Sequence, residues 1–191
     1  MQMSSFFSAL ALGSAALLAA HPAVAQKKLV PAQSEVQFTA RQMGVPLEGH
    51  FKKFDAQVSF DPAKLATSKI VFTVDTGSAT MGSRETDAEL PKATWFNVPQ
   101  FPQATFQSSA IKALGAGKFE VTGKLSIKGM ARDVVVPVTL VQNGATTLAT
   151  GALPLKRLAF KIGENEWADT SMVADDVQVK FKLALTGVGK L

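Results

Sequence analysis

The strongest constraint on the fold is a strict alternation of apolar and polar side chains. In the stretch 54–61 the apolar members are Phe54, Ala56, Val58 and Phe60, and the residues between them are polar. Successive side chains of a β-strand point to opposite faces, so this period of two predicts a strand with one apolar and one polar face. The apolar face could contact a packed core, a second protein or an apolar ligand held inside the molecule.

The same alternation recurs along the chain. It predicts further strands at residues 35–40, 69–75, 106–111, 119–127, 132–141, 146–155 and 177–185. Gly-rich residues 114–118 and the pair Asn143-Gly144 mark hairpin turns. About eight strands with hairpin spacing predict an all-β fold, either a closed antiparallel barrel or a sandwich. Gly123 predicts a bend inside its strand, and Pro137 predicts an edge or a bulge.

The connection 77–104 departs from this pattern. Residues 84–90 predict a short helix, which Ser83 can cap and Pro91 ends. Acidic side chains in its first turn favour the helix start. Prolines and aromatic residues follow, so we expect a helical flap with an apolar underside, lying across one end of the barrel or packed beside it.

The N-terminal segment predicts export. Residues 6–20 form an apolar run without charge, and Ala23 and Ala25 give the small-x-small pattern of a signal-peptidase site. We therefore predict a signal peptide at 1–25, cleavage after Ala25, one domain at 26–191 and a periplasmic location; a buried core helix is the alternative. No later segment approaches the ~18 apolar residues of a membrane-spanning helix, so none is expected after cleavage.

Composition excludes several function classes. The chain has no Cys and a net charge of +5, with Lys and Arg scattered singly. A solvated basic surface is the simplest interpretation, with attraction to an anionic membrane surface or ligand as the alternative. Nucleic acid is not expected as a partner, because no basic helix or stacking motif is present. The sequence leaves open whether the chain forms a homodimer.

Catalytic and metal-binding patterns are sparse. His50 is the one histidine after the predicted leader, and without Cys it cannot complete a zinc site. It also lacks the sequence frame of a nucleophile and base. Glu164, Glu166 and Asp169 share a loop, but their spacing differs from that of a calcium loop. We therefore expect no enzymatic activity, no metal and no cofactor.

Four stretches together resemble the YceI-like family of secreted bacterial proteins. They are "VPLEGHFKKFDAQVSFDP" (45–62), "ELPKATWFNVPQFPQATFQS" (89–108), "FEVTGKLSIKGMARDVVVPV" (119–138) and "LKRLAFKIGENEW" (155–167). They follow the family's order and cover most of the chain after the leader. Trp95, in the first of two aromatic places, is the visible departure, and it bears on the shape of the pocket.

The resemblance implies an extended lipocalin-like antiparallel β-barrel whose tunnel binds a long isoprenoid, such as a polyprenyl chain or a quinone tail. The composition agrees, because the chain has 13 Phe and no Tyr and therefore offers aromatic surface without hydroxyl groups. A plain packed core would have the same composition. The predicted cavity lining is Phe38, Phe54, Val58, Phe60, Phe72, Val74, Trp95, Phe96, Phe106, Val121, Leu125 and Phe181.

A polar head group on such a ligand needs hydrogen-bond donors at the barrel mouth. The candidates are Arg41, His50, Arg84, Arg157 and Trp167. Arg157 is the preferred one, because it matches the family's Arg and its loop also contains Trp167. A guanidinium can bind phosphate oxygens with two parallel hydrogen bonds. The alternative is that Arg157 pairs with Asp169 or Glu166 and holds the loop shut.

The sequence therefore predicts a periplasmic protein that carries or sequesters an apolar isoprenoid lipid without covalent chemistry. The competing interpretation is a stress-linked structural or interaction module with a filled barrel. An outer-membrane barrel is a third interpretation, but the chain lacks the aromatic girdles and the uniform apolar face that lipid contact requires.

Overall fold

The computed structural model describes residues 27–191, so the predicted signal peptide and its cleavage site lie outside the described residues. The sheet contains the strands β1 Lys28–Leu29, β2 Glu35–Gln42, β3 Val45–Phe51, β4 Phe54–Ser59, β5 Lys69–Asp75, β6 Ala79–Thr80, β7 Gln103–Gly115, β8 Lys118–Ile127, β9 Met130–Asn143, β10 Thr146–Lys156 and β11 Asp176–Thr186. The helical segments are α1 Arg84–Glu89 and the 3₁₀ turns η1 Pro31–Gln33, η2 Leu65–Thr67, η3 Thr76–Ser78, η4 Arg157–Phe160 and η5 Asn165–Ala168. Within this range no helix is long and apolar enough to cross a membrane.

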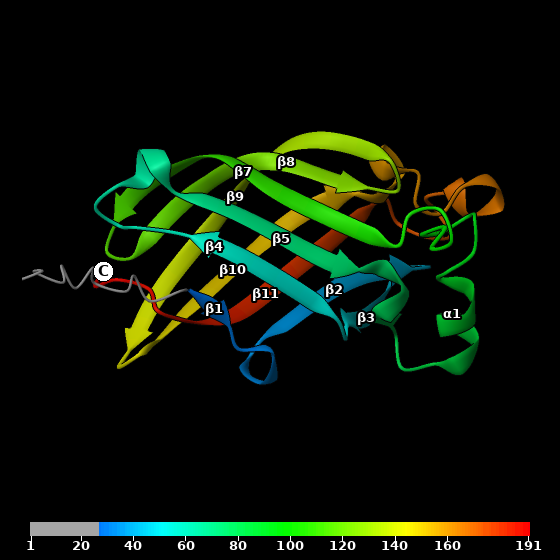
Figure 1. Cartoon of the computed structure of the whole chain (residues 1–191). Helices are drawn as coiled ribbons and strands as arrows, with labels where there is room; N and C mark the ends of the chain where they lie inside the picture. Colours follow the sequence, from blue (N-terminus) through cyan, green and yellow to red (C-terminus); the bar gives the residue numbers. More distant parts are fainter. Residues whose placement is uncertain (1–26) are drawn as a thin grey trace, which may run out of the picture.

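The strands form one curled antiparallel sheet (Figure 1). Neighbours follow the order β4-β5-β7-β8-β9-β10-β11-β2-β3-β6, and β1 pairs with β11 beside β4. The predicted all-β, antiparallel, barrel-like fold is confirmed. Among the described residues, no hydrogen-bonded ladder joins the two ends of the sheet, β4 and β6. Part of the gap is covered by β1, which pairs with β11 and contacts β4.

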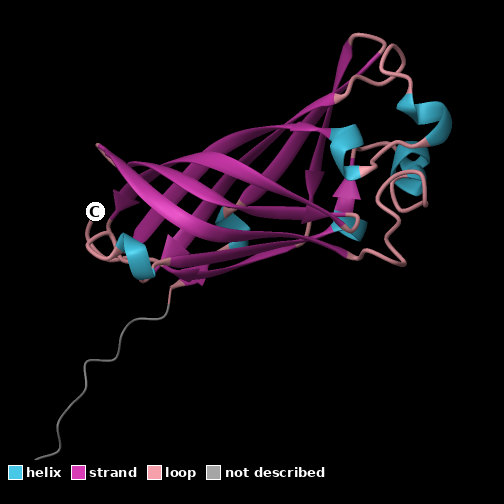
Figure 2. Ribbon diagram, turned by 90° about the horizontal axis from the view of Figure 1, so that it is seen from above, coloured by secondary structure: helices cyan, strands magenta, loops and turns pink. Residues whose placement is uncertain are grey.

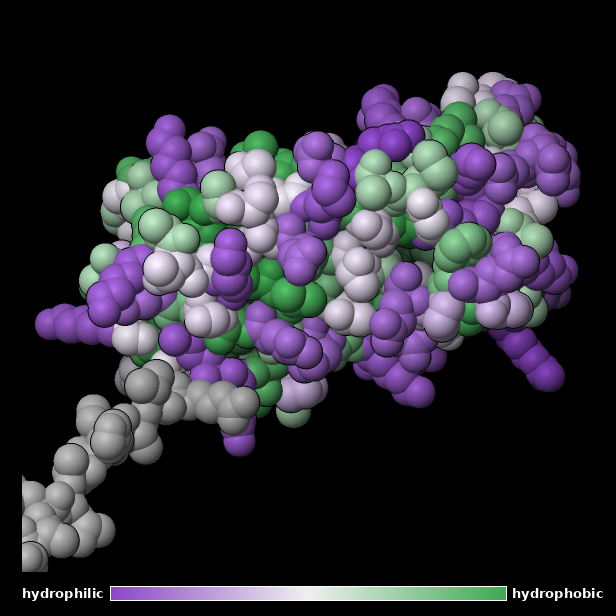
Figure 3. Space-filling view, turned by 45° about the horizontal axis from the view of Figure 1, so that its top comes forward, coloured by the Kyte–Doolittle hydropathy of each residue, from purple (hydrophilic) through white to green (hydrophobic). Residues whose placement is uncertain are grey.

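The alternation of side chains explains which face is inside. In β8, for example, Phe119 and Val121 are buried, whereas Lys118 and Lys124 on the other face are exposed. The outer surface agrees with this assignment, because hydrophilic side chains spread over much of the face seen in Figure 3. A sheet with one apolar and one polar face must curl or stack to bury the apolar side.

All eight strands predicted from the sequence are present, and three further strands were missed. β1 and β6 contain two residues each, which is too short for a period to show. β3 has the sequence VPLEGHF, in which Pro46 and Gly49 interrupt the alternation. The predicted helix is also present and ends one residue early, because Leu90 is its C-cap.

Pro137 lies at an edge as the sequence predicts, and Gly123 lies at an irregular place in its ladder. Gly123 pairs with Ser108 next to a register shift between Ser108 and Ala110, so the β7–β8 ladder is irregular at this glycine. Pro137 lies just beyond the Val138–Gly151 pair, where the β9–β10 ladder ends. From there toward Met130, β9 pairs only with β8, and the missing N–H of proline therefore interrupts no β9–β10 hydrogen bond.

The connection between β6 and β7 closes one end of the barrel, where α1 and its loops stand beyond the strands (Figure 2). Ser83 caps α1 by accepting from the Thr86 N–H. The Asp87 carboxylate accepts from the Thr80 hydroxyl (2.5 Å) and from the Met81 N–H (2.7 Å), which ties α1 to β6. These hydrogen bonds lower the pKa of Asp87 below its ordinary value, because they stabilise the ionised form.

The underside of this connection is apolar, as predicted. Leu90 and Phe96 are buried together with residues of the sheet and of the η4 turn, and the full cluster is Ala79, Leu90, Phe96, Ile127 and Phe160. The end of the barrel is therefore covered by a small hydrophobic core of its own rather than by a loose loop.

Three phenylalanine rings lie directly over glycines of the neighbouring strand. The pairs are Phe38 over Gly49, Phe106 over Gly123 and Phe181 over Gly151. A Cβ atom at any of these glycines would overlap the ring. The glycines let each ring lie close against the sheet, so the wall is aromatic without the rings filling the interior.

We predict that Gly49→Ala destabilises the fold by about 1–3 kcal/mol, the scale for an overpacked core. The added methyl group forces the Phe38 ring off the wall. Urea unfolding measures the effect, and Gly189→Ala is the control, because its Cβ would meet only an ordinary contact at 3.9 Å. In a Phe38→Leu background the cost of Gly49→Ala should fall. An unchanged cost in that background would mean that the ring is not what the methyl group meets.

Candidate ligand-binding site

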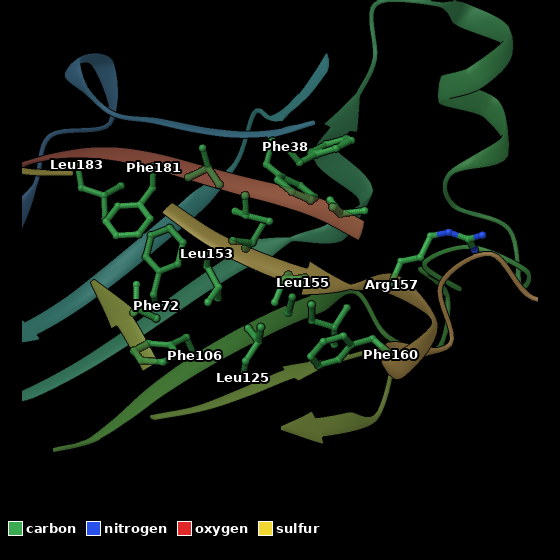
Figure 4. Close-up of a pocket in the computed structure, with 18 of the residues that line it drawn as sticks. Phe38, Phe72, Phe106, Leu125, Leu153, Leu155, Arg157, Phe160, Phe181 and Leu183 are labelled. Atoms are coloured by element: carbon green, nitrogen blue, oxygen red, sulfur yellow. The ribbon is translucent and has the colours of Figure 1, made fainter. Parts of the chain in front are cut away.

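The curled sheet encloses an elongated apolar cavity of about 510 Å³. This volume lies within the range of about 300–1,000 Å³ that small-molecule sites occupy. Inner-face side chains from nearly every long strand line it, and Figure 4 shows Phe72, Phe106, Leu125 and Phe181 around a common interior. The cavity runs along the axis of the barrel, so its shape suits a long chain rather than a compact molecule.

Polar lining residues are few and gather at one end. They are Arg41, Gln42, Glu85, Thr86, Glu89, Thr147 and Arg157. Glu85, Thr86 and Glu89 belong to α1. Gln42, next to Arg41, forms a β-bridge with Val173, whose carbonyl accepts from Arg157. Six of the seven therefore lie at the α1 end. Thr147, next to the β9–β10 hairpin, is the exception. The cavity is therefore apolar along its length and polar at the α1 end.

Eleven of the twelve residues predicted to line the cavity do so. They are Phe38, Val58, Phe60, Phe72, Val74, Trp95, Phe96, Phe106, Val121, Leu125 and Phe181. The prediction for Phe54 is wrong. Phe54 is the first residue of β4 and lines an outer pocket, whereas Ala56 and Val58 of the same strand line the cavity. The centroids of the Phe54 and Phe72 rings are 6.0 Å apart.

Sequence reasoning missed the lining contributed by the loops between β10 and β11 and by β3. The ring of Phe51 in β3 packs against the rings of Phe38 and Phe96, with centroid distances of 5.3 Å and 6.0 Å. Phe51 therefore connects the barrel wall to the connection between α1 and β7. Phe160, Ile162 and Val173 come from the loops between β10 and β11. Leu153 and Leu155 also line the cavity, and the alternation of their strand could have identified them.

Arg157 is the most deeply buried of the polar lining residues at this end, with only 3% of its surface exposed. Every N–H of its guanidinium donates to a backbone carbonyl: Nε to Ala174 (3.0 Å), Nη1 to Ile162 and Gly163 (both 2.9 Å), and Nη2 to Trp167 and Val173 (both 2.6 Å). A guanidinium has five N–H donors, and all five are used.

The assignment of Arg157 as a donor to the ligand's head group is therefore corrected. The side chain borders the cavity, but it has no donor left for a ligand. The alternative from the sequence was a closed loop held by Asp169 or Glu166. The loop is indeed held by Arg157, through carbonyls rather than through those carboxylates.

Burial and a nearby charge act on Arg157 in opposite directions. Burial lowers the pKa of the guanidinium from its ordinary value, and the Asp175 carboxylate partly offsets this effect. Gly163 fits against the guanidinium at a φ of +76°, where a side chain would both strain the backbone and meet Nη1. The charge is thus accommodated by a loop shaped around it.

A second buried cation fixes the same loop. Lys128, at the β8–β9 turn, donates to the Lys161 carbonyl (2.6 Å) and to the Glu164 carboxylate (2.8 Å), and its side chain is 5% exposed. Glu164 therefore serves this ion pair. Asp169 accepts from the backbone and hydroxyl of Ser171.

The remaining head-group candidates lie in different places. Arg41 is exposed and lines the α1 end of the cavity, with one weak hydrogen bond to the Gly44 carbonyl at 3.3 Å. Arg84 is exposed at the first residue of α1 and does not line the cavity. His50 lines the outer pocket beside Phe54. Trp167 lines the cavity, and its ring lies 5.5 Å from that of Trp95.

Comparison with known protein families supports the resemblance seen in the sequence. The model of the YceI-like domain matches residues 28–185. A UPF0312 protein of Azotobacter vinelandii is 36% identical over 140 residues, which cover 71% of this chain and 72% of that protein. A Salmonella arizonae protein named YceI is 34% identical over 110 residues, 57% of either chain.

Solved structures share the fold. The crystal structure of Burkholderia cenocepacia BcnA has a TM-score of 0.79 and 51% sequence identity, covering 82% of this chain and 98% of that one. A polyisoprenoid binding domain from Saccharophagus degradans has a TM-score of 0.68 over 84% of this chain and 98% of that one. At 13% identity, the second likeness shows the fold alone.

We predict that Arg157→Ala lowers the free energy of unfolding by about 3 kcal/mol or more, because it leaves five buried carbonyls without their shared donor. Urea unfolding measures this. The control is Arg132→Ala, whose exposed side chain should change stability by no more than about 0.5 kcal/mol.

The same variant tests whether Arg157 contacts the head group of the ligand. Affinity for an isoprenoid with an anionic head and for one without a head should fall together, because the end of the barrel loosens. Unchanged stability combined with a loss confined to the anionic ligand would show that Arg157 contacts the head group.

Proposed function

The chain belongs to the YceI-like family, and from this premise we propose that it binds a long apolar isoprenoid lipid, of polyprenyl or quinone type, inside its barrel. The observation that supports the proposal most is the axial cavity, which is about 510 Å³ and apolar except at the α1 end. A filled barrel would offer no such space.

Burial alone can hold such a ligand. Each methylene group removed from water contributes about 0.8 kcal/mol, which an isoprenoid tail repeats many times along its length. Part of this is lost to the ordering of the chain and to its reduced translational freedom. The walls are preformed, with Phe38, Phe106 and Phe181 held over glycines, so little further ordering of the protein is required.

The family adds a ligand class. The structurally similar domain from Saccharophagus degradans is described as polyisoprenoid binding. The present chain shares its fold and places a continuous apolar wall in the corresponding interior, which supports the same class of ligand here.

The predicted leader at 1–25 suggests where the protein works. An exported carrier would take up or sequester a membrane-derived lipid in the periplasm and shield its tail from water. The cycle consists of binding and release and needs no catalytic step.

Blocking the cavity should weaken uptake. Leu125 faces the interior from β8 (Figure 4), and Leu125→Trp should lower affinity for a fluorescent polyprenyl probe by at least about tenfold. Space is available for the indole, so stability should fall by less than the 1–3 kcal/mol or so of an overpacked core. Fluorescence titration and urea unfolding measure the two effects.

Val135→Trp is the matched control, because Val135 is 51% exposed on the outer face of β9. It should leave both affinity and stability nearly unchanged. If Leu125→Trp instead removes stability in proportion to binding, or if the wild-type protein takes up no probe, the barrel is filled and the alternative of a structural or interaction module is favoured.

A further inference from the structure

The end of the barrel opposite α1 carries an excess of lysine. We call it the hairpin end, because the β7–β8 and β9–β10 hairpin turns lie there beside β1 and the C-terminal residues (Figure 1). It comprises residues 28–29, 60–69, 111–120, 140–147 and 186–191. Its side-chain carboxylates are those of Asp61 and Glu120. Its lysines are Lys28, Lys64, Lys69, Lys112, Lys118 and Lys190.

These six lysines are exposed and have no partner within the described part of the chain, residues 27–191. The ion pairs found in that part lie elsewhere, three of them at the α1 end. The ammonium groups that donate hydrogen bonds there also belong to other lysines. The positive charge of the hairpin end is therefore not neutralised by the protein, and it remains available to an anionic partner.

The opposite end of the barrel has a different balance of charge. There, nine carboxylates accompany eight cations, and two of these cations, Lys128 and Arg157, are buried. The residues counted are 41–48, 83–92, 128–132 and 156–176. The exposed surface of the α1 end is thus acidic, so the two ends would respond in opposite ways to an anionic surface.

The hairpin end also exposes apolar side chains. Leu114 precedes the β7–β8 turn and is 51% exposed, and Val141 precedes the β9–β10 turn and is 49% exposed. The two hairpins are neighbours, because the Leu140 N–H donates to the Gly117 carbonyl (2.8 Å). Single exposed apolar residues are ordinary, but apolar side chains among unpaired lysines are the combination that binds the surface of a bilayer.

We propose that the hairpin end docks on the surface of an anionic phospholipid bilayer. The six lysines face the lipid head groups, and Leu114 and Val141 enter the interfacial layer. The cavity reaches this end of the barrel, where Leu140, Thr147 and Val188 line it. Docking therefore brings one end of the cavity against the membrane and holds the acidic α1 end away from it.

The distribution of the lysines favours a bilayer over an acidic protein. They come from separate segments, and none of them lines the cavity or the outer pocket beside Phe54. A diffuse positive surface matches the diffuse negative charge of a leaflet. Protein interfaces, in contrast, are depleted in Lys and centre on an apolar core, whereas Leu114 and Val141 lie on two separate turns.

Two triple variants test the contribution of charge. One is Lys64→Gln/Lys118→Gln/Lys190→Gln at the hairpin end. The matched control, Arg84→Gln/Arg132→Gln/Lys161→Gln, removes the same net charge from exposed, unpaired cations of the α1 end. Binding is measured by sedimentation with vesicles of phosphatidylcholine, with and without phosphatidylglycerol, and urea unfolding checks that both variants are folded.

Wild-type protein should bind the vesicles that contain phosphatidylglycerol, and added salt should weaken this binding. Each lysine near an anionic leaflet contributes about fivefold in affinity. The hairpin-end variant should therefore lose about 20- to 100-fold, whereas the control should stay within about threefold. Equal losses in the two variants would show attraction by net charge without a docking end, and a wild-type protein that does not bind would overturn the proposal outright.

The apolar contribution has its own matched pair. Leu114→Ser/Val141→Ser should weaken vesicle binding by about fivefold or more, the scale of partial burial of two apolar side chains. Met43→Ser/Met172→Ser is the control, because Met43 and Met172 are 69% and 41% exposed at the α1 end. If neither pair matters and polyglutamate displaces the protein as well as anionic vesicles do, the partner is an acidic polypeptide and the bilayer is wrong.

The orientation can be measured directly, because the chain contains no Cys. Leu114→Cys and Met43→Cys each provide one site for an environment-sensitive fluorophore. With anionic vesicles, the emission of the label at position 114 should shift to the blue, and that of the label at position 43 should not. A shift at position 43 alone would mean that the α1 end docks instead.

These measurements use vesicles without an isoprenoid, so they are independent of the proposed function. A protein that docks but takes up no isoprenoid probe retains the docking surface and loses the proposed cargo. A protein that takes up the probe but binds no anionic vesicle retains the cargo and loses the docking surface.

Discussion

The Arg157 guanidinium organises the α1 end of the barrel. It donates to five carbonyls spread over residues 162–174, a segment that also meets the sheet through the bridge between Gln42 and Val173. Lys128, a second buried cation, donates hydrogen bonds to the Lys161 carbonyl and the Glu164 carboxylate of the same loop. Charge-assisted hydrogen bonds are about twice as strong as neutral ones, so the two cations are the main polar contacts that hold this loop. The position of Trp167, Ile162 and Val173 in the cavity wall follows from this arrangement.

Away from that end, the cavity depends on the geometry of aromatic rings and glycines. A small barrel either fills with its own side chains or leaves space for one ligand. Here Phe38, Phe106 and Phe181 lie over strand glycines, so large apolar side chains cover the wall and the axis stays open. The absence of Tyr from the chain removes hydroxyl groups that would need partners in such a lining. The site is thus an apolar tube with one organised polar end.

The alternation of side chains was enough to predict the long strands and their inner faces, because both depend on a local period. The prediction for Phe54 was wrong because a local period shows which face a residue belongs to but not where along a strand the cavity ends, and the first residue of β4 lies beyond that end. β3 was missed because Pro46 and Gly49 hide its period. The sequence shows Arg157 as a cation in a loop, and only the fold brings five carbonyls around it.

The central claim is that the barrel holds an isoprenoid lipid, and the most direct measurement is mass spectrometry of the protein purified from the periplasm of a Gram-negative host. Native spectra should show a species heavier than the apoprotein, and an organic-solvent extract of the same sample should contain an isoprenoid lipid in near-stoichiometric amount. A homogeneous apoprotein that also fails to take up an added isoprenoid quinone would contradict the account, as would an extract whose stoichiometric ligand is not an isoprenoid.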